Sequence, residues 1–437
     1  MGVRPGRPGD PAGGRPHCRN GPRMTPTSVP LLLLDMLASP GITAPTRLQG
    51  MTAEDWQALQ HVARQHRLGP MLHYRFLVSQ QRSLLPAAVR DDWERQYRKS
   101  ATRSLVIQHA LVTVQARLLD AGIRSAALKG AWLAWQMYDE PALRPMRDID
   151  LLVADDQVEQ AYAVLIAAGA GPAPKSNISV GEARASHKHM PPLVFGHPRV
   201  CFEIHWRLSL PAPDEDPQAQ IAQTTALLAR SVDVIVGKEK VTCLDPTDTL
   251  LHLIAHAVYD HRLDNGPTIL SDLAAILTKA DIDWPRFWEM LDSQGRRPGA
   301  ELLFALVAEY HHIQPERLGN AASCKPPAEL IEAAKALMIK DLDQRTEVYF
   351  DAEMVAAGNL FGKARMIGRR AFPPRHIVAH YSGRSTESSW LWLWYPVRLA
   401  DYAWRYLRKR SNSGRQLDVS REHVLHAWLA KGPRPSE

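Results

Sequence analysis

The sequence has few cysteines and no long apolar run. Its 437 residues include four cysteines, which lie far apart and show no Cys-x-x-Cys spacing. This pattern argues against a disulfide framework or a zinc ribbon and favours a reducing cytoplasm. No stretch reaches the roughly 18 apolar residues of a membrane-spanning helix, and the first 24 residues lack the apolar segment of a secretory signal. We therefore expect a cytoplasmic globular protein.

Basic charge is concentrated at the two ends of the chain. Residues 1–30 carry five Arg against one Asp, and residues 363–437 carry fifteen Lys or Arg against five Asp or Glu. Because the net charge of the whole chain is only +7, the body between these ends is acidic. An acidic body lacks the broad basic groove that a polynucleotide needs, so we do not expect nucleic acid as a partner.

Composition and periodicity divide the chain into five regions and predict an α+β fold flanked by helical segments. The predicted regions are a disordered basic tail (1–30), a helical segment (31–118), an α+β core (119–245), a helical domain (246–362) and a basic Trp- and Arg-rich C-terminal region (363–437). The Pro-, Gly- and Arg-rich tail cannot build a core, and Met24 within it is an alternative start to Met1.

Local signals predict where several helices begin and end. Thr52 with Asp55 three residues later resembles a capping box. The long helical pattern that follows stops at Gly122, as is typical of a helix C-terminus. Either Asp155 or Asp156 is expected to cap the amphipathic helix that begins beside them.

Two aspartates open an apolar run that is typical of a buried strand. Asp148 and Asp150 lie at i and i+2 of the predicted strand 148–153, so their side chains point to one face. Neighbouring carboxylates repel each other unless a cation lies between them. Mg²⁺ prefers carboxylate and phosphate oxygens, so the pair predicts a site for Mg²⁺, or alternatively Mn²⁺, on a nucleoside triphosphate. The other interpretation is a strand whose acidic start is simply solvated.

A Lys-Gly pair precedes the short helix ahead of these aspartates. Gly130 lets the backbone approach a phosphate closely, and a helix N-terminus offers N–H groups to an anion. Lys129 adds a positive charge, and Arg144 in the following loop is a further candidate for stabilising charge on the phosphates. The alternative role for Arg144 is a salt bridge that braces the loop. Lys129, Gly130 and Arg144 are therefore the predicted nucleotide-binding residues.

A third acid is expected on the next strong strand, predicted around residues 200–208. Glu203 is the candidate, because two-metal phosphoryl-transfer sites usually use a third carboxylate. An exposed strand residue is the alternative interpretation. Histidines and a lysine near this strand are candidates for contacts with the substrate, with a solvated loop as the alternative. These candidates are His187, Lys188, His189 and His205.

Three further residues have structural explanations. His252 and His256 lie at i and i+4 on one helix face, but no HExxH glutamate lies between them, which excludes that metalloprotease motif. We expect them to be core or groove-lining histidines. Asp272 is interpreted as an acid near a helix start, where the helix dipole favours it.

The segment 390–410, "WLWLWYPVRLADYAWRYLRKR", combines aromatic and basic residues. One interpretation is a segment docked on the body through its tryptophans. The other is peripheral contact with a membrane, with aromatic anchors and basic residues for anionic lipid. Pro396 interrupts the run and favours docking. The tryptophans predicted to dock are Trp390, Trp392, Trp394 and Trp404.

The block "LKGAWLAWQMYDEPALRPMRDIDLLV", with "EIHWRL" and "LLHLIAH" after it, resembles the uncharacterised nucleotidyltransferase family of the DNA polymerase beta superfamily. The resemblance covers roughly residues 35–280 and is specific at the central block. In the superfamily a Gly-Ser pair binds triphosphate, and an Asp-x-Asp with a third acid binds two divalent metals. Lys129 and Gly130 match the Lys-Gly pair that replaces Gly-Ser in this family, and no Ser follows Gly130.

The resemblance implies a fold, a reaction and residue roles. The fold is a small polymerase-beta-like sheet with helices. Arg144, Asp148 and Asp150 match the Arg-Pro-Met-x-Asp-x-Asp signature, and Glu203 matches the third acid. Asp148 and Asp150 would hold Mg²⁺ on the triphosphate, while Glu203 would help to hold a second ion and draw an acceptor hydroxyl toward its anion. The acceptor would then attack the α-phosphate, and pyrophosphate would leave.

Two points of function stay open at this stage. The acceptor is an unidentified small molecule, peptide or protein. The alternative to an active enzyme is a catalytically weak module on the same fold that binds a nucleotide or a partner.

Overall fold

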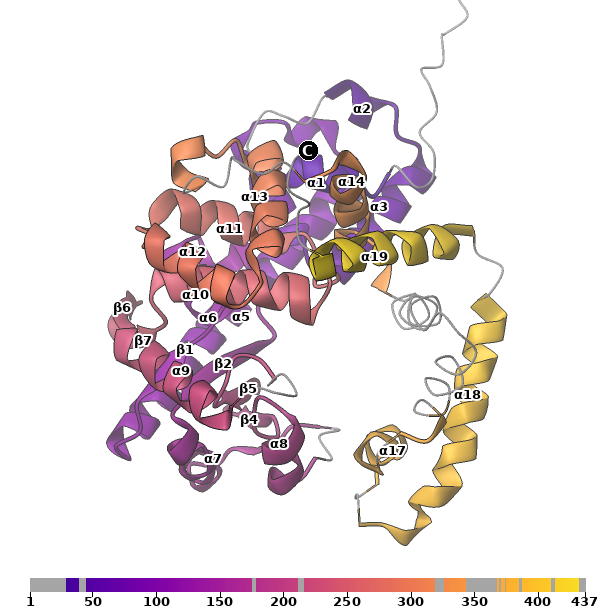
Figure 1. The fold of residues 1–437 in the computed structure, drawn as a ribbon. Coiled ribbons are helices and arrows are strands. Elements are labelled where there is room, and N and C mark those ends of the chain that lie inside the picture. The colour runs from indigo at the N-terminus through magenta and orange to yellow at the C-terminus, as the bar shows by residue number, and fades with distance from the viewer. Residues whose placement is uncertain are drawn as a thin grey trace, which may run out of the picture.

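The computed structural model describes most of the chain. The described residues are 29–38, 45–174, 178–210, 216–318, 326–342, 368, 371–373, 375–384, 387–409 and 413–431. Of the predicted basic tail, residues 1–28 lie outside this part of the chain. Figure 1 shows a small sheet with α7 and α8 below it in the view and α10 to α13 above it. The α+β prediction is confirmed, and the bounds of the five predicted regions stay a prediction.

Two helix boundaries in the first helical segment, the start of α3 and the end of α5, lie where local sequence signals place them. Asp55 N donates to Thr52 Oγ1 at 3.2 Å and Thr52 N donates to Asp55 Oδ2 at 2.8 Å, which confirms the capping box. The last helix ends just before Gly122, which has a φ of +75°. The helices are α1 (Leu32–Leu37), α2 (Pro45–Gln49), α3 (Ala53–Gln65), α4 (Gly69–Val78) and α5 (Ala87–Asp120).

Within the described residues, seven strands form one mixed sheet in the order β3-β4-β5-β2-β1-β7-β6. At its centre β2 is parallel to β5 and antiparallel to β1. The predicted strand 148–153 is confirmed, whereas the one predicted around 200–208 ends at His205. The strands are β1 (Ser125–Ala127), β2 (Asp148–Val153), β3 (Gly171–Pro172), β4 (Leu193–Phe195), β5 (Val200–His205), β6 (Val232–Val236) and β7 (Glu239–Cys243).

Four helices connect these strands, and one predicted cap is wrong. They are α6 (Gly130–Gln136), α7 (Val158–Ala167), α8 (Val180–Ser186) and α9 (Pro217–Arg230). Neither Asp155 nor Asp156 caps α7, because both lie in a 3₁₀ turn before its N-cap residue, Gln157, and no side chain caps it. Asp155 instead accepts hydrogen bonds from Arg184 at 3.0 and 3.1 Å.

The two faces of β2 carry different chemistry. Ile149 and Leu151 belong to the main hydrophobic core. On the opposite face Leu152 packs in a smaller cluster with Leu227 and Leu228 of α9. Because side chains alternate along a strand, Asp150 and Asp148, two and four positions before Leu152, point to this second face. The core therefore orients the start of β2 so that its polar side chains face away from the main core.

A buried glutamine of α5 joins two strands of the sheet. The parallel pairing of β1 with β7 contains one residue pair, Ala127 with Cys243. Gln115 Nε2 donates to the carbonyl oxygens of Thr242 at 2.8 Å and Ser125 at 3.3 Å, and its Oε1 accepts from Thr242 N at 2.9 Å. The side chain thus supplies hydrogen bonds that a longer strand pairing would otherwise provide.

Helices return after the sheet, and one of them contains a π-helical turn. This turn, η4, follows α10 directly. The elements are α10 (Pro246–Ile254), η4 (Ala255–Asp260), α11 (Thr268–Lys279), α12 (Trp284–Ser293), α13 (Arg297–His311), α14 (Ala328–Met338), α17 (Arg375–Ser382), the 3₁₀ helix η8 (Ser389–Leu393), α18 (Trp394–Lys409) and α19 (Ser413–Lys431).

The prediction that segment 390–410 docks on the body through four tryptophans is wrong for three of them. Trp390, Trp392 and Trp404 are 59%, 65% and 65% exposed. Trp394 packs on a small cluster of residues from α17 and η8, so its apolar contact is made locally. Figure 1 shows α17 and α18 to one side of the sheet and its helices. Peripheral membrane contact through this segment stays a prediction.

No helix in the described part of the chain is both long enough and apolar enough to pass through a bilayer.

We expect Gln115→Leu to lower the free energy of unfolding by about 2–4 kcal/mol, because each buried backbone group left without a partner costs about 1–3 kcal/mol. Urea unfolding followed by circular dichroism measures the change. The control is Gln108→Leu on the same helix, since the Gln108 side chain makes no hydrogen bond within the described residues. An equal loss of stability in both variants would contradict the role of Gln115.

Candidate active site

The register between β2 and β5 brings the three predicted acids to one face of the sheet. In this parallel pairing Asp150 lies opposite Glu203, and Asp148 lies opposite Cys201. Directly paired residues of neighbouring strands project to the same side, and Asp148, two residues before Asp150, shares that side. Two of the acids therefore lie at the start of β2, and the third lies beside them on β5.

Three side chains in this region lie close enough to share one metal ion. Asp150, Glu203 and His205 each offer a ligand atom, and these atoms lie within 4.8 Å of one another. His205 Nε2 is 3.3 Å from Asp150 Oδ1 and 3.5 Å from Glu203 Oε2. The His205 side chain is 1% exposed. A buried histidine thus bridges two of the predicted acids, while Asp148 lies beside this group.

Burial and neighbouring charges shift the pKa values of three groups in the cluster. Burial, followed by the nearby charges of Asp150 and Glu203, raises the pKa of Asp148 to about 6. Burial acts in the same direction on Asp150, but Lys129 and His205 hold the pKa of Asp150 well below its usual value. Burial alone would lower the pKa of His205, and its hydrogen bonds to Asp150 and Glu203 raise it instead. The raised pKa of Asp148 therefore reflects its burial first and its neighbouring carboxylates second.

Lys129 has a strained backbone, and its side chain neutralises part of the negative charge of these carboxylates. Its φ of 49° and ψ of −122° lie in a region that residues with a Cβ seldom adopt. Such a conformation costs on the order of 1–3 kcal/mol and persists only where the surrounding structure enforces it. The Lys129 ammonium lies 2.9 Å from Asp150 Oδ2. The predicted phosphate-binding lysine is thus paired with a predicted metal ligand.

Gly130, the first residue of α6, lies against the guanidinium of Arg144. A Cβ added at Gly130 would lie 1.9 Å from Arg144 Nη1. Arg144 in turn donates through Nε and Nη2 to Asp272 Oδ1 and Oδ2 at 2.7 and 2.8 Å. Tyr138 OH donates to Asp272 Oδ1 at 2.6 Å. We call these four residues, Gly130, Tyr138, Arg144 and Asp272, the arginine brace.

The ion pair between Arg144 and Asp272 agrees with the alternative role predicted for Arg144, a salt bridge that braces the loop. Asp272 is 2% exposed and lies in the second turn of α11, so it serves as an ion-pair partner and is not a helix-start acid. An acid within the otherwise apolar run of this helix was the sequence signal that could have identified it. A direct contact between Arg144 and a nucleotide stays a prediction.

Two of the predicted substrate-contacting histidines join the acid cluster. His189 pairs with His205 through an isolated antiparallel bridge, and their rings are 5.1 Å apart. His189 Nε2 is 3.7 Å from Glu203 Oε2. Burial lowers the pKa of His189, partly offset by the charge of Glu203. These histidines therefore flank the third acid from two sides.

The other two predicted contacts come directly before His189, at the end of α8 and in the loop that follows it. His187 is the C-cap residue of α8, and its ring is 6.0 Å from that of His189. Lys188 Nζ lies 2.6 Å from Asp260 Oδ2 at the end of the π-helical turn η4. The loop after α8 is thereby connected to both β5 and η4.

His252 and His256, for which the sequence predicts no catalytic role, lie near cations of the site. Burial, followed by the charges of Lys129 and Lys188, lowers the pKa of His252 well below its usual value. His256 is affected in the same direction, by burial first and by Lys129 next. His252 Nε2 is buried and has no hydrogen-bond partner within the described residues. The burial of His252 fits the prediction that these are core or groove-lining histidines.

We expect Gly130→Ala to destabilise the fold by about 1–3 kcal/mol, because the added methyl group collides with a buried ion pair. Chemical unfolding measures the change. Gly181→Ala is the matched control, since nothing lies within 4 Å of a Cβ at Gly181 of α8. That substitution should be neutral or slightly stabilising, because Ala favours a helix over Gly. Wild-type stability of Gly130→Ala would contradict the close packing described here.

The comparison with protein families agrees with this geometry. Residues 52–312 match the uncharacterised nucleotidyltransferase family, which confirms the resemblance noted in the sequence. None of the curated proteins compared with the chain matches it. The α+β fold is compatible with the wider polymerase beta superfamily. Because the match spans more than half of the chain, the protein belongs to the uncharacterised nucleotidyltransferase family and is a nucleotidyltransferase.

Proposed function

We propose that this nucleotidyltransferase moves a nucleoside monophosphate from a nucleoside triphosphate to an acceptor hydroxyl, and that the reaction depends on Mg²⁺. The observation that carries the proposal is the pairing of Asp150 with Glu203 on adjacent strands, with Asp148 on the same face. Phosphoryl-transfer sites use such converging carboxylates to hold divalent ions on the reacting phosphate.

The residues of the cluster fit a divalent cation. Carboxylate oxygens are the ligands that Mg²⁺ prefers. A cation would also relieve the repulsion of Asp148 by Asp150 and Glu203, which adds to burial in raising the pKa of Asp148. Asp148, Asp150 and Glu203 are the residues that would hold the metal. Mn²⁺ is the alternative, because carboxylate oxygens suit it as well as Mg²⁺. When bound, the ion supplies positive charge to the triphosphate and the leaving pyrophosphate.

The chain's own residues would position the reactants. Gly130 at the start of α6 would let the backbone approach the phosphates, and Lys129 and Arg144 would contribute positive charge. Glu203 has a lowered pKa, because His205 and His189 outweigh the effect of burial, so it is ionised at neutral pH. It would accept the proton of the acceptor hydroxyl as the new oxygen–phosphorus bond forms and the bond to pyrophosphate breaks.

The acceptor would enter beside the loop after α8. His187, Lys188 and His189 line its path to Glu203 in this proposal, since His189 contacts Glu203 and Lys188 contacts Asp260. We propose a small molecule, a peptide or a protein as the acceptor and no polynucleotide, in keeping with the acidic body of the chain. We place the reaction in the cytoplasm on the basis of the sparse, widely spaced cysteines.

One observation favours the alternative, a catalytically weak module that binds a nucleotide or a partner. Both cations predicted to contact phosphate are paired with acids, Lys129 with Asp150 and Arg144 with Asp272. An active site would have to release Lys129 from Asp150 when a nucleotide and its metal bind. A weak module would retain the pair, so the two candidates differ in how strongly triphosphate binding depends on metal.

We expect the purified protein, incubated with Mg²⁺ and cell extract, to transfer label from an α-labelled nucleoside triphosphate to an acceptor. Label at the γ position should appear in pyrophosphate, because the bond between the α- and β-phosphates breaks. Asp150→Asn and Glu203→Gln should each lower the transfer rate by about 10²–10⁴-fold, since each removes a charged group at the reacting phosphate. Chelation of divalent ions should abolish transfer.

The control variant is Asp156→Asn, which removes an exposed acid just beyond β2 and should transfer label at the wild-type rate. Transfer of γ label to the acceptor would contradict the proposed reaction. Undiminished transfer by Asp150→Asn would contradict the metal assignment. Triphosphate binding that is equal with and without Mg²⁺, combined with no transfer, would support the weak module.

A further inference from the structure

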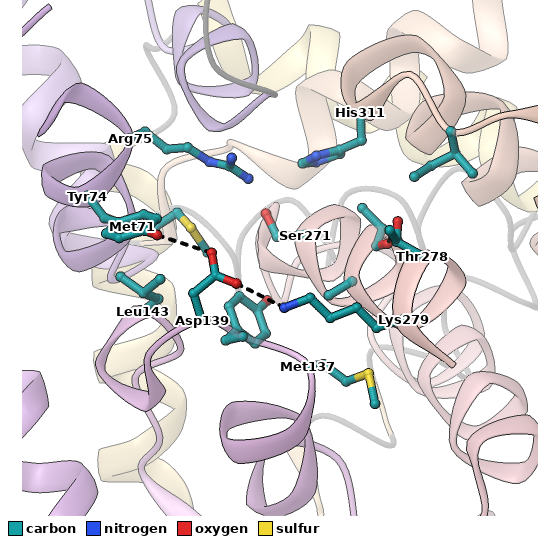
Figure 2. Close-up of a pocket in the computed structure, with 14 residues that line it drawn as sticks. Met71, Tyr74, Arg75, Met137, Asp139, Leu143, Ser271, Thr278, Lys279 and His311 are labelled. Carbon is teal, nitrogen blue, oxygen red and sulfur yellow. Dashed lines mark hydrogen bonds and ion pairs between the residues drawn. The ribbon is translucent and has the colours of Figure 1, made fainter. Parts of the chain in front are cut away.

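A second pocket lies apart from the acid cluster, between the N-terminal helices and α11. Its volume is about 260 Å³. Figure 2 shows side chains from α4, the segment after α6, α11 and the end of α13 around it. Asp148, Asp150, Glu203 and His205 are not among the residues that line it. The pocket is therefore separate from the proposed catalytic site.

The pocket contains an arginine without a counter-ion. Arg75 of α4 is half-buried, and its side chain forms no ion pair or hydrogen bond within the described residues. Its Nε atom is fully buried. Burial lowers the pKa of Arg75, partly offset by the nearby Tyr138 and Asp139. Because an unpaired buried donor is costly, such a group usually has a partner that binds to it.

A second unpartnered donor faces the same space. Ser271 of α11 is 5% exposed, and its hydroxyl oxygen is buried without a hydrogen-bond partner in the described part of the chain. Figure 2 shows this hydroxyl pointing toward the space between Arg75 and His311. Two elements distant in sequence thus direct unused donors into one cavity.

The charges around the pocket leave one net positive charge. Lys279 Nζ lies 3.0 Å from Asp139 Oδ1, and Tyr74 OH donates to Asp139 Oδ2 at 3.1 Å, so Lys279 is neutralised. Burial lowers the pKa of His311 to about 4, which makes this histidine neutral at pH 7. The charge that remains among the lining residues is that of Arg75, and it suits a monoanion.

The rest of the lining is mostly apolar. It consists of thioether and aliphatic side chains that offer no hydrogen bonds to a polar ligand and favour an apolar one. These residues are Met71, Met137, Leu143, Ala274, Ala275 and Ile313. A ligand that satisfies the whole cavity would therefore carry its charge at one end and hydrocarbon at the other.

We propose that this pocket binds a small carboxylate with an apolar body, whose two oxygens accept hydrogen bonds from Arg75 and Ser271 while the hydrocarbon contacts Met71 and Met137. A carboxylate matches the planar fork of a guanidinium and carries the single negative charge that the pocket accommodates.

The test compares two acids with their alcohol analogues in titration calorimetry on the full chain. The probes are phenylacetate and hexanoate, and the controls are 2-phenylethanol and hexan-1-ol. We expect the acids to bind with dissociation constants below about 10 mM and at least about tenfold more tightly than the alcohols, because a charge-assisted hydrogen bond is worth about 1.5–3 kcal/mol. Arg75→Gln should remove this preference, and Arg117→Gln, an exposed arginine on α5, should leave it intact.

Two further readouts keep the test decisive. Methyl resonances of Met71 and Met137 should shift when phenylacetate is added, while that of Met190 beside the acid cluster should not. Arg75→Gln should unfold at the wild-type temperature or higher, because Arg75 has no partner to lose. If Arg75→Gln fails to fold, Ser271→Ala should still weaken phenylacetate binding several-fold. Absence of acid binding, or equal binding of acid and alcohol, would overturn the proposal.

Discussion

The parallel register of β2 with β5 is the constraint on which the rest of the site depends. It sets Asp150 directly beside Glu203 on a partly buried face, where like charges repel. Two features nearby compensate for this repulsion: Lys129 keeps a strained backbone and places its ammonium on Asp150, and the buried His205 bridges both acids. A shift of one residue in the register would turn Glu203 to the other face, so the cluster requires this pairing.

Helices outside the sheet also help to hold the site in position. In the arginine brace, Asp272 of α11 fixes Arg144, and Arg144 packs against Gly130 at the start of α6. Asp272 is 128 residues away from Arg144 in sequence, in the region predicted as a separate helical domain. Tyr138 belongs both to the brace and to the lining of the second pocket. The helices after the sheet therefore take part in positioning the nucleotidyltransferase core.

The features that the sequence predicts correctly depend on residues that lie close together in the chain. The alternation of side chains along a strand was enough to pair Asp148 with Asp150, and the capping box at Thr52 depends on residues three positions apart. The partner of Arg144 and the proximity of His252 to Lys129 depend on how distant helices pack, which no local pattern encodes. The expected cap at Asp155 or Asp156 is wrong because a 3₁₀ turn moves the N-cap of α7 to Gln157.

The most direct test of the central claim is anomalous diffraction from a crystal soaked with Mn²⁺ and a non-hydrolysable nucleoside triphosphate. The account predicts a manganese peak within about 2.5 Å of carboxylate oxygens of Asp150 and Glu203, with the Lys129–Asp150 ion pair broken. A triphosphate bound elsewhere, with that ion pair intact and no manganese between β2 and β5, would contradict it.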